Sequence, residues 1–201
     1  MHKVDPHADH RIGPNAILQL AVTLRARLGE AETERVFATA GLTHMLVNPP
    51  TEMVDERDVA ALHRALFILL PETAPSLADD AGRRTADYIL ANRIPRAAQF
   101  VLKLSPPLLA ARLLLAAITK HAWTFAGSGR FRVHRGRPNV VEIGANPIAA
   151  GNGQWHRAVF ERLFQTLVSS HAHVTTTACC AAGAHACRFE IDIAPARDRM
   201  P

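Results

Sequence analysis

The sequence predicts an α+β protein with a helical N-terminal part, followed by an antiparallel sheet with packed helices. Apolar residues recur at helical spacing as far as residue 121 and then change to the alternating spacing typical of strands. The length of 201 residues suits one domain that can bury a sizeable core. We therefore expect a single domain over 13–193, divided into a helical part (13–121) and an α+β part (122–193). A mobile tail (1–12) and a second tail (194–201) flank it.

Apolar stripes that end at glycine or proline predict the helices of the first part. Asp55 is a suitable N-cap for a helix that runs to Leu70, before Pro71. The other helices are expected over 15–28, 31–40, 76–92, 97–104 and 108–120. The last of these is apolar almost all round, so it either lies in the core or faces an apolar ligand, and the core is the commoner case.

Short alternating runs predict the strands of the second part. These runs are 123–126, 130–134, 140–143, 173–178 and 186–193. Gly127 and Gly129 lie between two of them, where glycine typically marks a bulge or bend. A helix with Trp155 and Leu167 on one face is expected between the run 140–143 and the run 173–178. A turn at Gly183 then joins 173–178 and 186–193 as a hairpin.

Composition narrows the classes of function. The formal net charge is +5, but the 20 arginines and 3 lysines are spread along the chain without the dense cluster of a nucleic-acid binder. The start of the chain is polar, and the most apolar stretch, 106–119, is shorter than the roughly 20 residues that span a bilayer. Three cysteines fit a reducing compartment. We expect a cytoplasmic protein that does not bind nucleic acid.

A cysteine pair near the C-terminus raises the question of a metal site. Cys180 and Cys187 flank a glycine turn, with Cys179 and His185 beside them. Structural zinc usually takes two closely spaced ligand pairs, and only one loose pair is present here. Packing as small apolar groups, metal binding and redox chemistry all remain open, and the spacing favours packing. Cys180, Cys187 and His185 are the weak metal candidates.

Aromatic and basic residues gather in the second part and predict a ligand site. An aromatic wall beside arginines suits a flat hydrophobic ring that bears carboxylates, although a small core with a solvated basic strand would give the same pattern. The candidate ligand-binding residues are Trp123, Phe125, Phe131, Arg132, His134, Trp155 and Phe160. His121, His134 and His156 are the candidate axial ligands for a tetrapyrrole metal. Neither glycine cluster, Gly127–Gly129 or Gly151–Gly153, matches the dinucleotide fingerprint, so no redox cofactor is identified and the catalytic residues stay unassigned.

A family resemblance rests on three segments. The run from Cys180 through Gly183 to Cys187 and Phe189 resembles the end of the 4-vinyl-reductase domain, a small-molecule-binding module of bacteria and archaea. Residues 86–96 and 122–129 resemble the bacteriochlorophyll-synthesis members of that family in purple bacteria. The likeness extends from about residue 13 to residue 193. The turn at 184–186 departs from the family pattern, in which it is often shorter.

The resemblance implies both a fold and a function. The fold would be similar to Golgi transport-particle subunits and nitric-oxide-sensing haem domains. The protein would bind a magnesium tetrapyrrole, divinyl protochlorophyllide or a neighbouring intermediate, as a carrier or accessory factor for 8-vinyl (4-vinyl) reduction. The alternative is that it is the divinyl protochlorophyllide vinyl reductase itself. Implied partners are the tetrapyrrole and other bacteriochlorophyll-synthesis enzymes. A homodimer and contact with the photosynthetic membrane stay open.

Overall fold

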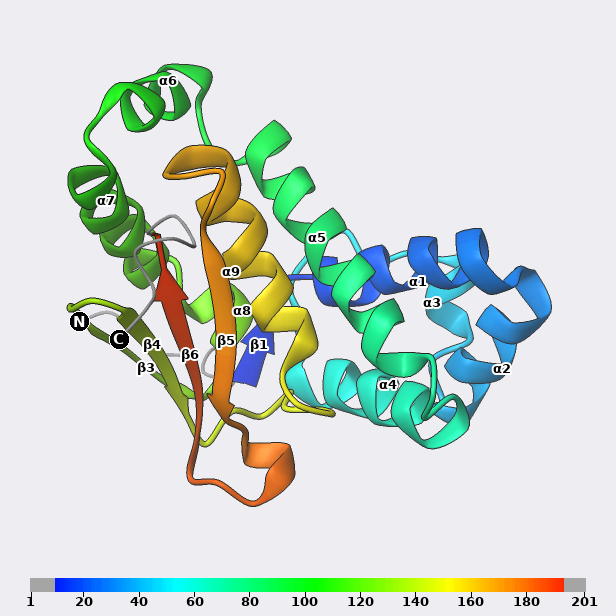
Figure 1. Cartoon of the computed structure of the whole chain (residues 1–201). Coiled ribbons are helices and arrows are strands. Elements are labelled where there is room, and N and C mark those ends of the chain that lie inside the picture. Colours follow the sequence, from blue (N-terminus) through cyan, green and yellow to red (C-terminus); the bar gives the residue numbers. More distant parts are fainter. Residues whose placement is uncertain (1–9, 194–201) are drawn as a thin grey trace, which may run out of the picture.

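The computed structural model describes residues 10–193 and confirms the α+β class (Figure 1). The parts of the expected tails at 1–9 and 194–201 lie outside the described residues. A lobe of N-terminal helices stands beside a four-stranded antiparallel sheet, and long helices connect the two. Buried apolar residues of the lobe, the long helices and the sheet form one continuous core.

The N-terminal lobe contains four helices and a small strand pair. The elements are β1 (Arg11–Ile12), α1 (Asn15–Leu28), α2 (Glu30–Thr39), α3 (His44–Val47), β2 (Val54–Asp55) and α4 (Glu56–Leu69). The Asp55 carboxylate accepts a 2.8 Å hydrogen bond from the backbone N–H of Arg57, which confirms the predicted N-cap. Residues 11 and 12, which were expected in the N-terminal tail, form β1 instead: Ile12 is fully buried and pairs with Val54.

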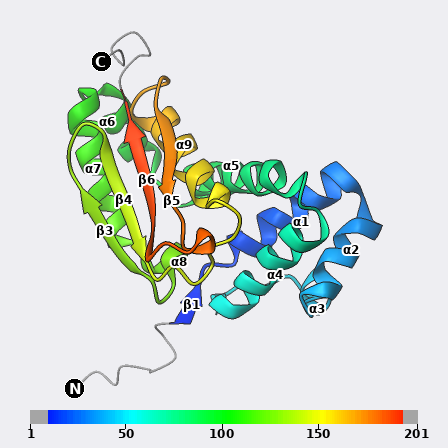
Figure 2. The same cartoon turned by 60° about the horizontal axis from the view of Figure 1, so that its bottom comes forward.

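The remaining helices lie on one face of the sheet (Figure 2). They are α5 (Ala74–Asn92), α6 (Arg96–Leu104), α7 (Pro107–Lys120), α8 (Trp123–Ala126) and α9 (Gln154–Leu167). The strands are β3 (Arg130–His134), β4 (Asn139–Gly144), β5 (His173–Ala178) and β6 (Ala186–Asp192), in the order β3-β4-β6-β5. Period-two alternation turns Cys187, Phe189 and Ile191 of β6 inward, where all three are fully buried. The Phe160 ring of α9 packs edge-on against the Phe189 ring at 5.5 Å.

The prediction of a strand over 123–126 is wrong, because this segment is the short helix α8. Its backbone folds back on the end of α7: Thr124 N–H donates to His121 O at 3.0 Å and Ala126 N–H to Ala122 O at 2.8 Å. A four-residue alternating run carries too little periodicity to separate strand from helix. The following Gly127–Gly129 segment therefore joins a helix to β3 instead of bending a strand.

The α5 and α9 helices cross in unusually close contact at Gly82. A Cβ atom at this position would lie 2.4 Å from the Trp155 carbonyl oxygen and 2.8 Å from the Ala158 Cβ. Backbone cannot yield at such a distance, so the crossing requires glycine.

A charge cluster around the buried Glu161 carboxylate stabilises the same contact next to Gly82. The Glu161 carboxylate of α9 accepts hydrogen bonds from Arg83 (3.1 Å), His173 (2.8 Å) and the Val174 N–H (3.2 Å), and it pairs with Arg157. Burial by itself would raise the pKa of Glu161. The Val174 N–H and the Arg157 charge outweigh burial and hold that pKa below its ordinary value.

We expect Gly82→Ala to destabilise the protein by about 3 kcal/mol, because the added methyl group pushes α5 away from α9. Urea unfolding followed by circular dichroism measures the change. Arg84→Ala, on the exposed side of the same helix, is the control and should stay within about 0.5 kcal/mol of the unchanged protein. An equal effect of the two substitutions would contradict the close crossing.

Candidate functional site

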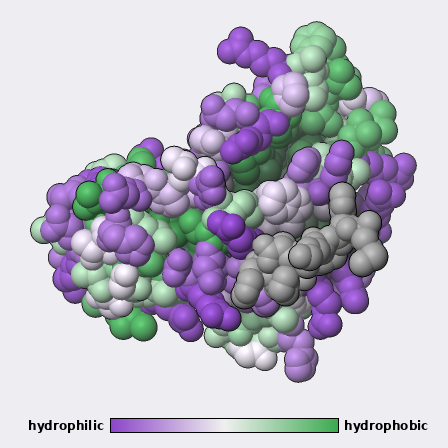
Figure 3. Space-filling model, turned by 180° about the vertical axis from the view of Figure 1, so that it is seen from behind, coloured by the Kyte–Doolittle hydropathy of each residue, from purple (hydrophilic) through white to green (hydrophobic). Residues whose placement is uncertain are grey.

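A cavity of about 410 Å³ lies between the helices on the inner side of the sheet. It opens at the back of the molecule, where a hollow lined with hydrophobic side chains is visible (Figure 3). Its walls come from α5, α7, α8, α9 and the first turn of α1. The apolar lining residues include Ile89, Ile94, Leu114, Ile118, Trp123, Phe125, Trp155, Val159, Phe160 and Leu163.

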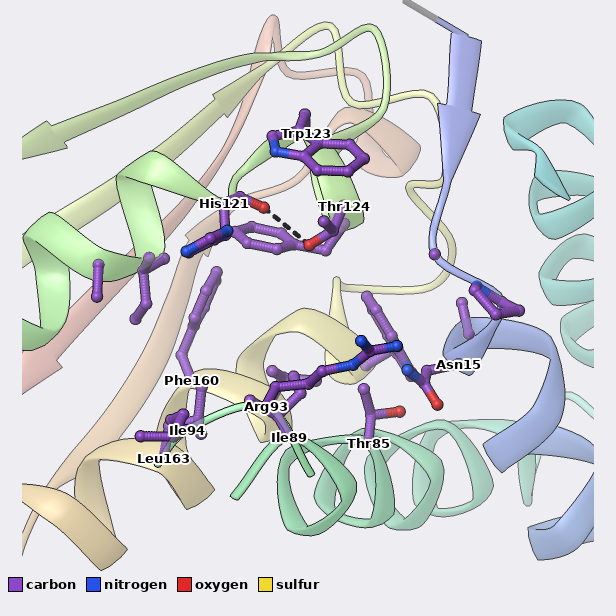
Figure 4. Close-up of a pocket in the computed structure, with 18 of the residues that line it drawn as sticks. Asn15, Thr85, Ile89, Arg93, Ile94, His121, Trp123, Thr124, Phe160 and Leu163 are labelled. Carbon is purple, nitrogen blue, oxygen red and sulfur yellow. Dashed lines mark hydrogen bonds between the residues drawn. The ribbon is translucent and has the colours of Figure 1, made fainter. Parts of the chain in front are cut away.

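A few polar groups interrupt the apolar wall (Figure 4). The Arg93 side chain reaches across the cavity with its guanidinium toward Asn15, and Trp123 lies on the opposite side. Asn15 Oδ1 and Trp155 Nε1 are buried and have no hydrogen-bond partner among the described residues. An unpaired buried donor and an unpaired buried acceptor are rare in folded proteins, and here both belong to residues of a cavity wall. The site can therefore offer an occupant the Arg93 charge, the Trp155 N–H donor and the Asn15 acceptor.

The structure brings together four of the seven candidate ligand-binding residues. Trp123, Phe125, Trp155 and Phe160 all line the cavity. Phe131 does not line it, but its ring packs against Phe125 at 5.5 Å from behind.

Arg132 and His134 lie outside the cavity because of strand alternation. The inner face of β3 carries Phe131 and Val133, so the two polar side chains point to the exposed face. There His134 lies 3.8 Å from Glu142 of the neighbouring strand. Of the three candidate axial histidines, His121 alone is among the lining residues.

Part of the cavity wall comes from the helical lobe and from α5, and the sequence did not predict this part. Asn15, Thr85, Ile89 and Arg93 reach the cavity from segments far from the aromatic cluster in the sequence. Only one signal was available: Arg93 falls within the 86–96 segment that carries the family resemblance. Nothing in spacing or composition connects Asn15 with Trp155, because tertiary packing alone makes them neighbours.

Glu56 fixes the loop that follows α8 and so positions the cavity wall. Its carboxylate accepts 2.7 Å hydrogen bonds from the backbone N–H and the hydroxyl of Ser128, and it contacts His10 Nδ1 at 2.9 Å. Burial would raise the pKa of Glu56, but these hydrogen bonds lower it more, so the carboxylate stays charged at neutral pH. Gly127, with φ of +55°, leaves room for this carboxylate, since a Cβ there would lie 2.2 Å from Glu56 Oε2.

Two buried histidines support the cavity from behind. His156 Nε2 donates to the Phe125 carbonyl at 3.1 Å and ties α8 to α9, while His63 Nε2 donates to the Ala16 carbonyl at 3.3 Å. Both rings pack edge-on against Trp155, at 4.8 Å for His156 and 6.0 Å for His63. Burial lowers the pKa of each to about 4, so both are neutral in the folded protein.

The cysteines form a packed thiol cluster beside β6, away from the cavity. Cys187 donates to Cys179 with 3.6 Å between the sulfur atoms, and Cys187 Sγ also accepts from Asn146 Nδ2 (3.4 Å) and Cys180 N (3.3 Å). The shared proton raises the pKa of Cys187 and lowers that of Cys179. His185 lies exposed on the turn. Across residues 10–193, no three His, Cys, Asp or Glu side chains gather in an arrangement that could hold a metal ion.

Comparison with known sequences identifies the family. A V4R domain matches residues 139–193, which contain the cysteine hairpin. A bacteriochlorophyll synthase 23 kDa chain of Cereibacter sphaeroides is 52% identical over 192 residues, covering 92% of each chain. The chain of the same name from Rhodobacter capsulatus is 45% identical over 197 residues, covering 95% of this chain and 91% of that one. The chain belongs to the bacteriochlorophyll synthase 23 kDa family. The resemblance noted in the sequence is thereby confirmed.

Solved structures similar to this member of the 23 kDa family are H-NOX proteins. An unliganded Fe(II) H-NOX protein from K. algicida aligns with a TM-score of 0.64 at 9% identity, over 90% of this chain and 96% of that one. An H-NOX protein from S. oneidensis in the Fe(II)NO ligation state aligns with a TM-score of 0.54 at 9% identity, over 91% of this chain and 99% of that one. The expected likeness to the nitric-oxide-sensing fold is confirmed. At this identity the likeness establishes the fold alone.

We expect the two buried histidines to make the protein less stable in mild acid. In the unfolded chain His63 and His156 become protonated below about pH 6.5. In the folded protein they become protonated only below about pH 4. The free energy of unfolding should therefore fall by about 1.4 kcal/mol per pH unit for each histidine across this window. Urea unfolding at about pH 7 and about pH 5 measures the slope.

His156→Gln should remove one histidine's share of that slope, because glutamine keeps a donor for the Phe125 carbonyl and does not titrate. His121→Gln, at an exposed histidine, is the matched control and should leave the slope unchanged. A slope identical in all three proteins would refute the assignment.

Proposed function

We propose that the cavity binds a magnesium tetrapyrrole of bacteriochlorophyll biosynthesis, divinyl protochlorophyllide or a neighbouring intermediate. In this proposal the chain is a carrier or accessory factor that holds the pigment for 8-vinyl (4-vinyl) reduction and presents it to other enzymes of the pathway. The observation that carries the proposal is the aromatic cavity with unpaired polar atoms. The names of the two 23 kDa relatives support the pathway.

The shape and lining of the cavity suit a flat apolar ring. Its volume of about 410 Å³ falls within the roughly 300–1,000 Å³ of small-molecule sites, which are mostly apolar with a few placed polar groups. Trp123 on α8 lies across the space from Phe160 and Leu163 on α9. Phe125 packs edge-on against Phe160 at 5.8 Å and completes the aromatic wall. Aromatic faces and edges make favourable contacts with a π system. Trp123 is 57% exposed, so it can cover an occupant that enters from solvent.

The polar groups of the wall match the substituents of such a pigment. Protochlorophyllide bears a propionate, and Arg93 is the one lining residue with a permanent positive charge among those described. The Trp155 Nε1–H is free to donate to a ring ketone or ester carbonyl, which would satisfy the unpaired donor. His121 lines the wall and offers a ring nitrogen as an axial ligand for magnesium.

The H-NOX likeness is consistent with a macrocycle in this fold. One of the aligned structures, with a TM-score of 0.59 at 10% identity, concerns heme distortion in the H-NOX family. Heme and magnesium tetrapyrroles share the flat macrocycle and the acidic side chains. The likeness supports the ligand class, and the lining residues of this chain support the particular contacts.

We expect Arg93→Gln to weaken binding of protochlorophyllide about tenfold or more, since a hydrogen bond to a charged group contributes roughly 1.5–3 kcal/mol. The methyl ester of the same pigment, which has no carboxylate charge, should bind both proteins alike. Arg132→Gln is the matched control, because it removes the same charge from the exposed face of β3. Titration of pigment absorbance and fluorescence measures the affinities. Equal losses for acid and ester, or an equal loss in the control, would refute the carboxylate contact.

Trp123→Ala should also weaken pigment binding, by about 1 kcal/mol or more from the lost aromatic contact. Cys187→Ser should leave the affinity unchanged, because the thiol cluster lies away from the cavity. Circular dichroism of both variants controls for unfolding. A larger loss for the cysteine variant would place the pigment elsewhere.

Assay of the same complex distinguishes a carrier from a reductase. Reduction of a vinyl group needs a hydride source and a proton donor, and His121 is the histidine among the described lining residues. Pigment bound with no conversion of divinyl to monovinyl product, with reduced nicotinamide or flavin present, supports the carrier. Turnover by the purified chain would establish the reductase instead.

The carrier is proposed to work in the cytoplasm, at the photosynthetic membrane. Within residues 10–193, every helix falls short of the length and apolar character that a membrane crossing needs. Contact with the membrane would therefore be through a surface.

A further inference from the structure

The α6 and α7 helices expose an unusual number of large apolar side chains. Only Leu102 of α6 is buried, and the outward residues of the two helices are Phe100, Val101, Leu104, Leu108, Leu109 and Leu113. We call these six residues the apolar arm. Phe100 is 64% and Leu104 is 70% exposed. Figure 3 shows hydrophobic side chains gathered at the upper right, over α6 and α7. A contiguous patch of this kind marks an interaction surface.

The apolar arm forms one stripe along each helix. In α6, Phe100, Val101 and Leu104 have the i, i+1, i+4 spacing of a single helix face. In α7, Leu109 and Leu113 are likewise one turn apart. Ser105 and Pro106 reverse the chain between the helices, which contact each other. The α6 and α7 helices thus form a short helical hairpin, and the apolar arm is its outward side.

The sequence segment that contains the apolar arm carries charge of one sign. Between Asp87 and Glu142 the sequence contains nine Lys or Arg residues and no Asp or Glu. The rest of the chain has 14 basic and 18 acidic residues, a net charge of −4 against +9 for this segment. None of the nine forms an ion pair with a described residue. Lys103 and Arg112 lie on the same two helices as the apolar arm, one helical turn from Phe100 and Leu108 respectively.

We propose that the apolar arm docks the protein on an anionic phospholipid surface. Apolar side chains enter the boundary between headgroups and acyl chains, while the flexible stems of Lys103 and Arg112 keep their charges at the phosphate level. Basic residues near an anionic bilayer each add roughly 1 kcal/mol of attraction. A second copy of the chain is less suitable as the occupant, because two arms would bring positive charge against positive charge.

Placement of the arm connects the lipid surface with the cavity. The buried side of α7 supplies Leu114 and Ile118 to the cavity wall. The exposed Trp123 follows directly after that helix. Docking therefore brings the cavity wall to the membrane surface whatever the cavity holds.

Vesicle co-sedimentation of the full chain without pigment tests the docking. Vesicles of phosphatidylcholine alone are compared with vesicles that also contain phosphatidylglycerol. We expect binding to the anionic vesicles only, weakened by added salt because the charge contribution is screened. The pigment titration described above is a separate assay, so each proposal can fail without the other.

Two pairs of variants make the test specific to the arm. Phe100→Ser with Leu104→Ser, and separately Lys103→Glu with Arg112→Glu, should each lower vesicle affinity at least about tenfold. The matched controls are Val47→Ser with Ile68→Ser, at apolar residues 76% and 73% exposed on other helices, and Arg64→Glu with Arg84→Glu. These should bind as the unchanged protein does.

Three results would overturn the proposal. The first is no binding to either vesicle, and the second is an equal loss in arm and control variants. The third is sedimentation of the protein as a dimer that Phe100→Ser dissociates, without vesicle binding, which would assign the arm to self-association.

Discussion

The close crossing of α5 and α9 at Gly82 sets the positions of the cavity walls. Because a Cβ at Gly82 would meet the Trp155 carbonyl at 2.4 Å, the two backbones are nearer than any other residue would permit. Farther along the same helices, Ile89 and Arg93 on one side face Val159 and Leu163 on the other. The Glu161 cluster then fixes the rotation of α9 against both α5 and β5. A small residue at one contact thereby determines how wide the site is several turns away.

Helices and strands could be predicted from the sequence where the apolar periodicity within the element itself distinguishes helix from strand. The α5 and α9 helices, the Asp55 cap and the C-terminal hairpin all follow from local spacing and turn residues. The segment 123–126 could not be assigned, since four residues fit either period. Its helical state depends on hydrogen bonds to the end of α7 and on the Glu56 carboxylate, 72 residues from Ser128 in the sequence.

Only part of the cavity lining could be predicted from the sequence, because the rest depends on which way side chains point in the folded chain. Aromatic content pointed to Trp123, Phe125, Trp155 and Phe160, and these four residues line the cavity. Composition cannot register which face a strand residue takes, so Arg132 was grouped with Phe131 although alternation separates them. The arginine that reaches the cavity, Arg93, comes from the end of α5, because the 410 Å³ space is enclosed by segments from both halves of the chain.

The α7 helix connects the cavity with the proposed membrane surface. Its sequence has almost no polar face, which by itself indicates a helix surrounded by apolar material on all sides. In the fold, one side faces the core and the cavity through Leu114 and Ile118, while Leu109 and Leu113 face outward. Such a helix needs a second apolar environment, and a bilayer surface would supply it. An apolar pigment held on the inner side of α7 would then be separated from lipid by the thickness of one helix. If the pigment moved between the cavity and the lipid along the edge of α7, past Trp123, it would not have to pass through water.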